Sequence, residues 1–320
     1  MKKKLLILGN GFDLDLGLKS RYRDFMLSDI WNKTKIGANM QTCNLLIYLE
    51  NKNQIETWFD AETELLNYAL EITEGKHHIQ QTADRVGYKL FQTKLKEYLI
   101  KEQENFQLNS CSYAIPLMKA ITDNGFFDEI YTFNYTDVYK ILSKAGLSVP
   151  IKVTNMHGSL QENDEIILGI ETSKSICKEY QFLFKTNSRF YRSNSLIENM
   201  EKADEIIFFG HSINGMDFPY FMDFFIKQAD NTENVKKKNI TIFTYDEVSD
   251  EQIRNNFREA GINLRNLMQR NNLMFIETKL LSNGDGMELK KWNELLSHLK
   301  NDSREHMRRN HEQIASMLSF

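Results

Sequence analysis

Leu5-Leu6-Ile7-Leu8-Gly9-Asn10-Gly11-Phe12-Asp13 is the stretch of sequence that decides the predicted fold. Its first four residues are wholly apolar, which is typical of a strand buried on both faces of a parallel sheet. The two glycines predict a tight strand-to-helix turn, in which backbone N–H groups can approach a phosphate. The full GxGxxG pattern is absent, and a structural turn with Asp13 as a helix N-cap explains the same residues equally well.

Similar apolar runs recur later in the chain and end in glycine or polar residues. Helical patterns separate several of them, at 137–145, 218–229 and 249–260. Strands that alternate with helices imply right-handed crossovers and a mainly parallel sheet, so we expect an α/β fold flanked by helices. The predicted strands are 5–8, 129–133, 151–154, 165–168, 205–209, 240–244 and 273–276.

About a hundred residues of different character separate the first two predicted strands. From 22 to 124 the only proline is Pro116, and apolar residues recur with helical spacing. We therefore predict a large helical insertion after the first strand. The expected organisation is the first strand and glycine turn at 1–25, the insertion at 26–125, the rest of the core at 126–300 and a C-terminal helix at 301–320.

Composition limits the class of protein. The 320 residues include 40 Lys+Arg and 44 Asp+Glu, and this near-neutral balance argues against a surface built to hold nucleic acid. No apolar stretch approaches the ~20 residues of a membrane span. The scattered cysteines Cys43, Cys111 and Cys177 form neither a metal motif nor a disulfide framework. We expect a cytoplasmic globular protein, and no metal is implied.

Two polar residues follow predicted strands, at the edge of a parallel sheet where ligands bind. The amide of Asn134 can donate and accept hydrogen bonds, which suits a ribose hydroxyl or an attacking water. His157, followed by Gly158, stands where a general base would be placed. A capping asparagine and a structural histidine explain these residues when each is taken alone.

A further turn, at 210–217, also follows a predicted strand. Gly210 can let a ligand approach the backbone, and His211, Ser212 and Asp217 add polar side chains in the same loop. The alternative is that Asp217 simply caps the helix at 218–229, with Pro219 in its first turn.

Taken together, these segments resemble the AbiH family of phage abortive-infection proteins. The resemblance rests on the glycine-turn segment at 5–18, Thr-Phe-Asn-Tyr-Thr-Asp at 132–137, Met-His-Gly-Ser at 156–159 and Phe-Gly-His-Ser-Ile-Asn-Gly-Met-Asp at 209–217. It implies an anti-phage effector with a Rossmann-like, mainly parallel sheet flanked by helices and a helical module inserted into that core. The same order of motifs is similar, more distantly, to sirtuin-like bacterial defence proteins, in which it surrounds an NAD site.

The sirtuin-like resemblance implies roles for individual residues. Gly9 and Gly11 would lie against the pyrophosphate of NAD, with Asn10 between them. Asn134 would position the nicotinamide ribose or the attacking water, and His157 would be the catalytic histidine. In the turn at 210–217, Gly210, Ser212 and Asp217 would line the adenosine side, and His211 would also contact the cofactor.

Asp13 departs from that pattern, because a carboxylate beside a pyrophosphate is unfavourable unless it is paired. It would face a ribose hydroxyl instead, or the ligand would differ. Three scattered cysteines cannot supply the four-cysteine zinc ribbon of sirtuin deacetylases. Hydrolysis of NAD, as substrate, at the nicotinamide–ribose bond is therefore the better reading than deacetylation.

Two other functions stay open. The first is a non-catalytic defence module that senses a nucleotide. The second is a toxin ribonuclease that uses Arg304 and His311, which share one face of the predicted C-terminal helix. The expected partners are a small-molecule nucleotide and either a phage-derived activator or a second defence protein, with neither membrane nor nucleic acid. The apolar faces of the predicted helices either pack inside the protein or form the interface of a homo-oligomer.

Overall fold

Six parallel strands form one sheet in the computed structural model, which describes residues 3–37, 42–55, 59–124, 127–171, 174–191, 195–213, 215–232 and 234–301. The order across the sheet is β3-β2-β1-β4-β5-β6, and every neighbouring pair is parallel. The predicted α/β fold is confirmed. The strands are β1 (Lys4–Leu8), β2 (Glu129–Thr132), β3 (Val153–Asn155), β4 (Glu205–Phe209), β5 (Asn239–Thr244) and β6 (Asn272–Glu277).

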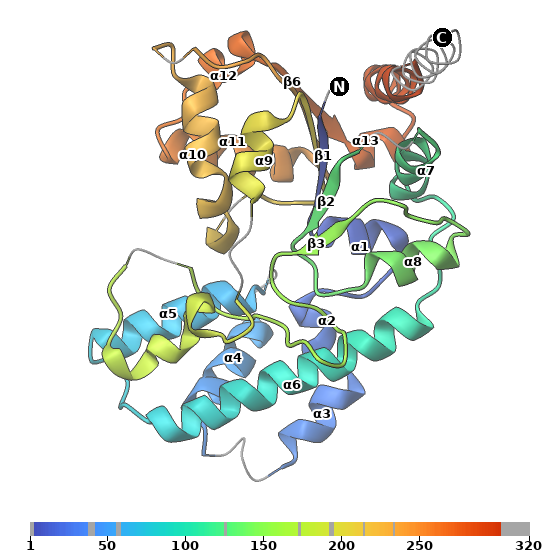
Figure 1. The fold of residues 1–320 in the computed structure, drawn as a ribbon. Helices are drawn as coiled ribbons and strands as arrows, with labels where there is room; N and C mark the ends of the chain where they lie inside the picture. The colour runs from blue at the N-terminus through green and yellow to red at the C-terminus, as the bar shows by residue number, and fades with distance from the viewer. Residues whose placement is uncertain are drawn as a thin grey trace, which may run out of the picture.

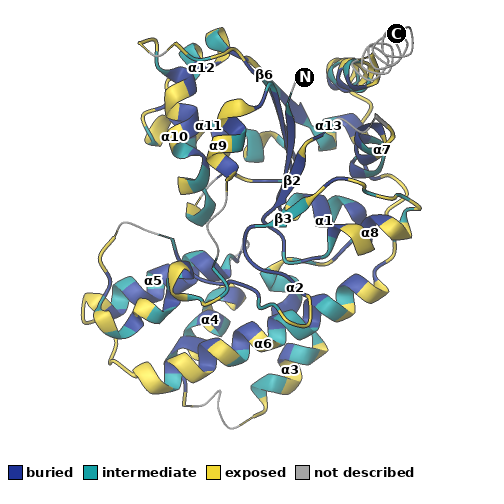
Figure 2. Ribbon diagram, in the orientation of Figure 1, coloured by how far each residue is buried: buried dark blue, intermediate teal, exposed yellow. Residues whose placement is uncertain are grey.

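The central strand β1 is buried along its length, and its last four residues are apolar, because helices cover both faces of the sheet (Figures 1 and 2). Leu6 and Leu8 pack on one face, with α1 (Asn10–Leu16), α7 (Ala114–Asn124), α8 (Val138–Lys144), α13 (Thr278–Ser282) and the helical residues 286–301. Leu5 and Ile7 pack on the other, with α9 (Leu196–Lys202), α10 (Pro219–Ala229), α11 (Glu247–Glu259) and α12 (Leu264–Arg270). The alternation follows from the two-residue period of a strand.

Strand order reverses on either side of β1. The chain runs from β1 to β2 and β3 on one side, then returns to β4 on the other side. Leu8 is in register with Thr132 of β2 and with Phe209 of β4. The turns that follow these three strands therefore meet at one edge, at the switch point where open α/β sheets bind ligands.

The helical insertion after the first strand is also present. Five helices pack around Phe25, Trp31 and Phe91, and apolar residues of 160–171 and 174–184 join the same core. We call this unit the helical module; in Figure 1 it lies at the carboxyl edge of the sheet. Its elements are α2 (Tyr22–Met26), α3 (Asp29–Lys35), α4 (Asn44–Ile55), α5 (Ala61–Thr73), α6 (Gln81–Asn105) and the 3-10 helices η1 (Lys178–Leu183) and η2 (Lys185–Asn187).

One predicted strand is wrong. The apolar run at 165–168 lies outside the sheet, although Ile166 and Leu168 are buried as the pattern predicted. Its carbonyl groups accept hydrogen bonds from side chains of α6, because Gln92 donates to Ile166 O and Tyr88 donates to Leu168 O. Side-chain donors of the helical module thus satisfy this backbone in place of a neighbouring strand.

Within the described residues no helix is long and apolar enough to cross a membrane. The predicted C-terminal helix, together with Arg304 and His311 of the ribonuclease alternative, lies outside the described residues except for residue 301.

Candidate functional site

The turns after β1 and β4 are in direct backbone contact. The N–H of Gly11 donates to Gly210 O at 2.8 Å, and the N–H of Gly9 donates to Phe209 O at 3.1 Å. A Cβ atom on Gly9 would lie 2.5 Å from His211 Cα, and one on Gly11 would lie 2.6 Å from Gly210 Cα. Glycine is therefore required here for the close approach of two turns. Both N–H groups already have acceptors, so a pyrophosphate could use them only if the turns separated.

Asp13 is the centre of a buried cluster beneath this contact. Its carboxylate accepts hydrogen bonds from Asn134 Nδ2 at 2.9 Å and from Thr136 Oγ1 at 2.8 Å. Asn134 Nδ2 also donates to Gly9 O at 3.0 Å, so both amide hydrogens of Asn134 are committed. Burial raises the pKa of Asp13 to about 7, against the lowering effect of Thr136 and Asn134. We call Asp13, Asn134 and Thr136 the Asp13 cluster.

The N-cap alternative for Asp13 is wrong. Helix α1 begins at Asn10 with Gly9 as its N-cap, so Asp13 lies inside the helix and its side chain is free to turn toward β2. Asn10 is exposed and its Oδ1 accepts a hydrogen bond from Ser20, and Ser212 is exposed on the turn after β4.

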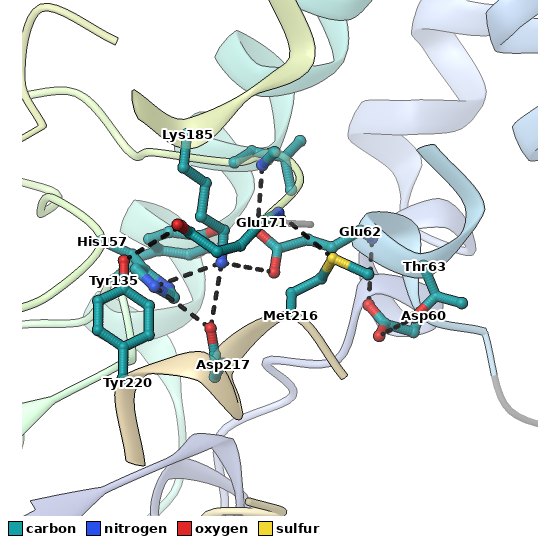
Figure 3. A network of polar contacts seen from close by, with 12 residues as sticks. Asp60, Glu62, Thr63, Tyr135, His157, Glu171, Lys185, Met216, Asp217 and Tyr220 are labelled. Atoms are coloured by element: carbon teal, nitrogen blue, oxygen red, sulfur yellow. Dashed lines mark hydrogen bonds and ion pairs between the residues drawn. The ribbon is translucent and has the colours of Figure 1, made fainter. Parts of the chain in front are cut away.

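A second buried cluster surrounds Lys185 (Figure 3). The Lys185 Nζ atom lies 3.0 Å from Glu62 Oε2, 3.1 Å from Asp217 Oδ1 and 3.3 Å from His157 Nε2. His157 Nε2 also lies 3.3 Å from Asp217 Oδ1. The Lys185 side chain is 0% exposed, whereas that of Asp217 is 23% exposed and gives the cluster its access to solvent. We call these four residues the Lys185 cluster.

Four separate segments present these side chains. Glu62 stands in the first turn of α5, which Asp60 caps by accepting a hydrogen bond from the Glu62 N–H. His157 follows β3, Lys185 begins η2, and Asp217 ends the 3-10 helix η3 (Gly215–Asp217) after β4. The cluster therefore joins the helical module to the carboxyl edge of the sheet.

The capping role considered for Asp217 is wrong. The N-cap of α10 is Phe218, and no side chain caps this helix, although Pro219 stands in its first turn as predicted. The Asp217 carboxylate turns toward Lys185 because a buried ammonium needs a counter-charge.

Burial and charge set the protonation states in the Lys185 cluster. Burial alone would raise the pKa of Asp217, but Lys185 and the nearby histidines outweigh it and lower that pKa to about 2. Burial, reinforced by Lys185, lowers the pKa of His157 to about 3. Burial raises the pKa of Glu62, and the charge of Lys185 opposes that rise. At neutral pH the cluster thus holds an ionised Asp217, a neutral His157 and an ammonium that stays charged, because its carboxylate partners outweigh burial and raise the pKa of Lys185.

His211 lies beside this cluster with a defined tautomer. Its Nδ1 accepts a hydrogen bond from the Ile213 N–H at 2.9 Å, so Nε2 carries the proton. The ring packs edge-on against Phe133 and Phe221, with centroid distances of 4.5 and 5.0 Å. Nε2 is buried, has no hydrogen-bond partner, and lies 3.8 Å from Asp217 Oδ2. Burial lowers the pKa of His211 to about 4.

The structure separates the two predicted catalytic residues. Asn134 belongs to the Asp13 cluster and His157 to the Lys185 cluster; both are within the described residues, and no hydrogen bond joins them. Phe133, next to Asn134, packs its ring 5.2 Å from that of His157. Sequence analysis missed Glu62 and Lys185 because neither stands in a motif. The only signal was Asp60, a residue type that caps helices, two positions before Glu62.

No group of three or more His, Cys, Asp or Glu side chains among the described residues is placed to hold a metal ion. Strand order and the two polar clusters at the switch point define a Rossmann-like α/β protein whose helical module contributes to the site. A family model described as bacteriophage abortive infection AbiH matches residues 5–244. The chain belongs to the AbiH family of bacteriophage abortive-infection proteins, as its motifs predicted. No curated protein matched the chain in a separate comparison.

Proposed function

We propose that this protein acts in abortive infection by hydrolysing NAD+ at the bond between nicotinamide and ribose. The observation that carries the proposal is the environment of Asp217: an ionised, partly exposed carboxylate beside the switch point, backed by Lys185 and flanked by the neutral rings of His157 and His211. Nucleotides bind at this edge of Rossmann-like sheets.

The chemistry requires little acid catalysis. Cleavage of the nicotinamide–ribose bond passes through an oxocarbenium-like state, and nicotinamide leaves as a neutral molecule. The Asp217 carboxylate would stabilise the positive charge that develops on ribose, and such electrostatic stabilisation is typically worth about 10²–10³ in rate. Water attacks the anomeric carbon from the face opposite nicotinamide, and its proton is released to solvent. The products are ADP-ribose, nicotinamide and one proton.

Substitution of the carboxylate tests this proposal. We expect purified protein to release nicotinamide and ADP-ribose from NAD+, with or without extract of phage-infected cells as activator. Asp217→Asn should lower the rate by about 100-fold or more. Asp223→Asn is the matched control, because Asp223 is an exposed carboxylate on α10 outside both clusters. An absence of nicotinamide under both conditions, with correctly folded protein, contradicts NAD+ hydrolysis.

A nucleotide-sensing module is the second candidate function. It is favoured by the closed contact between the two glycine turns, because these turns would have to separate to bind a pyrophosphate, and a change of conformation on binding suits a sensor. In that case NAD+ would raise the melting temperature of the protein and be recovered intact after prolonged incubation.

A further inference from the structure

His211 is held in place as a hydrogen-bond donor. The N–H of Ile213 that fixes its tautomer comes from a residue with φ of 46°, a left-handed conformation that a β-branched residue rarely adopts. Strain of this kind persists where the surrounding structure enforces it, commonly at binding sites. The result is a buried Nε2–H without an acceptor, which costs roughly as much as a lost hydrogen bond.

The donor stands beside an acceptor. Oδ1 of Asp217 faces Lys185 and His157, whereas Oδ2 is the oxygen nearest to His211, at 3.8 Å from Nε2. The donor, His211 Nε2–H, and the acceptor, Asp217 Oδ2, thus lie side by side at a partly exposed carboxylate. They match a ligand group that has an acceptor and a donor on neighbouring atoms.

We propose that His211 and Asp217 form a recognition pair for a primary carboxamide, with Nε2–H donating to the amide oxygen and Oδ2 accepting from the amide NH₂. This inference rests on the proposed function, in which the group is the carboxamide of nicotinamide. A phosphate does not suit the pair, because Asp217 would repel it. A hydroxyl has one oxygen for both contacts, whereas an amide presents an oxygen and a nitrogen to two partners that are 3.8 Å apart.

The proposal differs from the role that the sequence resemblance implied for this turn. In that reading Asp217 lined the adenosine side of NAD, and His211 contacted the cofactor. The contact of Asp217 with His157 instead favours the nicotinamide end for this turn.

Substrate discrimination provides the test. We compare kcat/KM for NAD+ with kcat/KM for the analogue that carries pyridine in place of nicotinamide. His211→Phe removes the donor and keeps an aromatic ring against Phe133 and Phe221. The preference for NAD+ should fall by about 10- to 100-fold in this variant relative to wild type. His77→Phe, in the helical module, is the control and should keep the full preference. The intrinsic reactivity of the two substrates cancels in this comparison.

A second measurement does not depend on cleavage or on a variant that folds. In nitrogen-15 NMR of wild-type protein, nicotinamide should shift the His211 Nε2 resonance, and pyridine should leave it in place. Unchanged discrimination in His211→Phe, or equal shifts with both ligands, overturns the recognition pair even when NAD+ is cleaved. A nicotinamide-specific shift without any cleavage of NAD+ supports the pair and refutes the proposed hydrolysis.

Discussion

Lys185 Nζ lies 3.0 Å from Glu62 Oε2, in a contact between η2 and α5 of the helical module. The other partners of the same ammonium, Asp217 and His157, lie at the carboxyl edge of the sheet. Glu62 Oε1 accepts a hydrogen bond from the Gly169 N–H at 3.1 Å, so both of its oxygens are engaged. The Lys185 cluster at the carboxyl edge of the sheet of this AbiH protein is therefore complete only when the helical module packs against that edge.

Removal of the Lys185 charge should destabilise the fold. Lys185→Met leaves Glu62 and Asp217 buried without their cation, and breaking a buried ion pair in this way costs about 3–5 kcal/mol. Urea unfolding measures the loss. Lys101→Met, which removes an exposed partner of Glu97 on α6 of the same module, should cost less than about 1 kcal/mol. Similar losses of unfolding free energy in the two variants would show that the Lys185 cluster stabilises the fold no more than an exposed ion pair does.

Asp13 should make the fold less stable as pH rises. Its pKa is about 7 in the native state against an ordinary value of 3.8, so between these pH values the unfolded chain ionises first and stability falls. The upper bound of this loss is about 4 kcal/mol. Asp13→Asn removes it, so the variant should gain stability relative to wild type between pH 4.5 and 7.5 in urea unfolding. A difference between the two proteins that is constant with pH would contradict a buried, protonated Asp13.

His157 should make the fold less stable as pH falls. Because burial lowers its native pKa from 6.5 to about 3, the unfolded chain binds a proton first as pH falls through 6.5, and stability is lost. His157→Gln should therefore lose less stability than wild type when pH is lowered from 7 to 5. His211 contributes a loss of the same sign in both proteins and cancels in the comparison. Melting temperatures at the two pH values test this, and parallel losses would exclude a buried neutral His157.

The contact between the glycine turns should not tolerate a side chain. A Cβ atom on Gly11 would lie 2.6 Å from Gly210 Cα, which is backbone and cannot move aside as a side chain can. Gly11→Ala should cost about 1–3 kcal/mol, as for overpacking of a tight core. Gly286→Ala is the control, because no atom lies within 4 Å of its added Cβ and the site is helical. Equal melting temperatures for wild type and Gly11→Ala would refute the close approach.

The sheet could be predicted because buried parallel strands need continuous apolar runs, and β1 and β4 are both wholly buried. The same rule failed at 165–168, where residues 166–168 are equally buried but Gln92 and Tyr88 supply hydrogen bonds to the backbone. An apolar pattern indicates that residues are buried, but it does not indicate which groups form hydrogen bonds with their backbone.

At the candidate site, the strand-end rule found Asn134, His157 and the turn at 210–217, because the carboxyl ends of parallel strands share one edge. It could not show that the amide of Asn134 holds the glycine turn, since that depends on the distance to Gly9 and Asp13. It could not find Lys185, because a lysine that stands in no motif has no sequence signature.

The sequence by itself determined the six strands of the sheet, the helical insertion and the family, because periodicity and motifs are local properties of the chain. Only the tertiary structure decided that the polar residues divide into two clusters, that Glu62 of the module meets Lys185, and that Asp217 is ionised beside a neutral His157. These properties depend on burial and on charges brought together from distant segments. A pKa is set by the surroundings of a group in space, and those surroundings exist only in the folded chain.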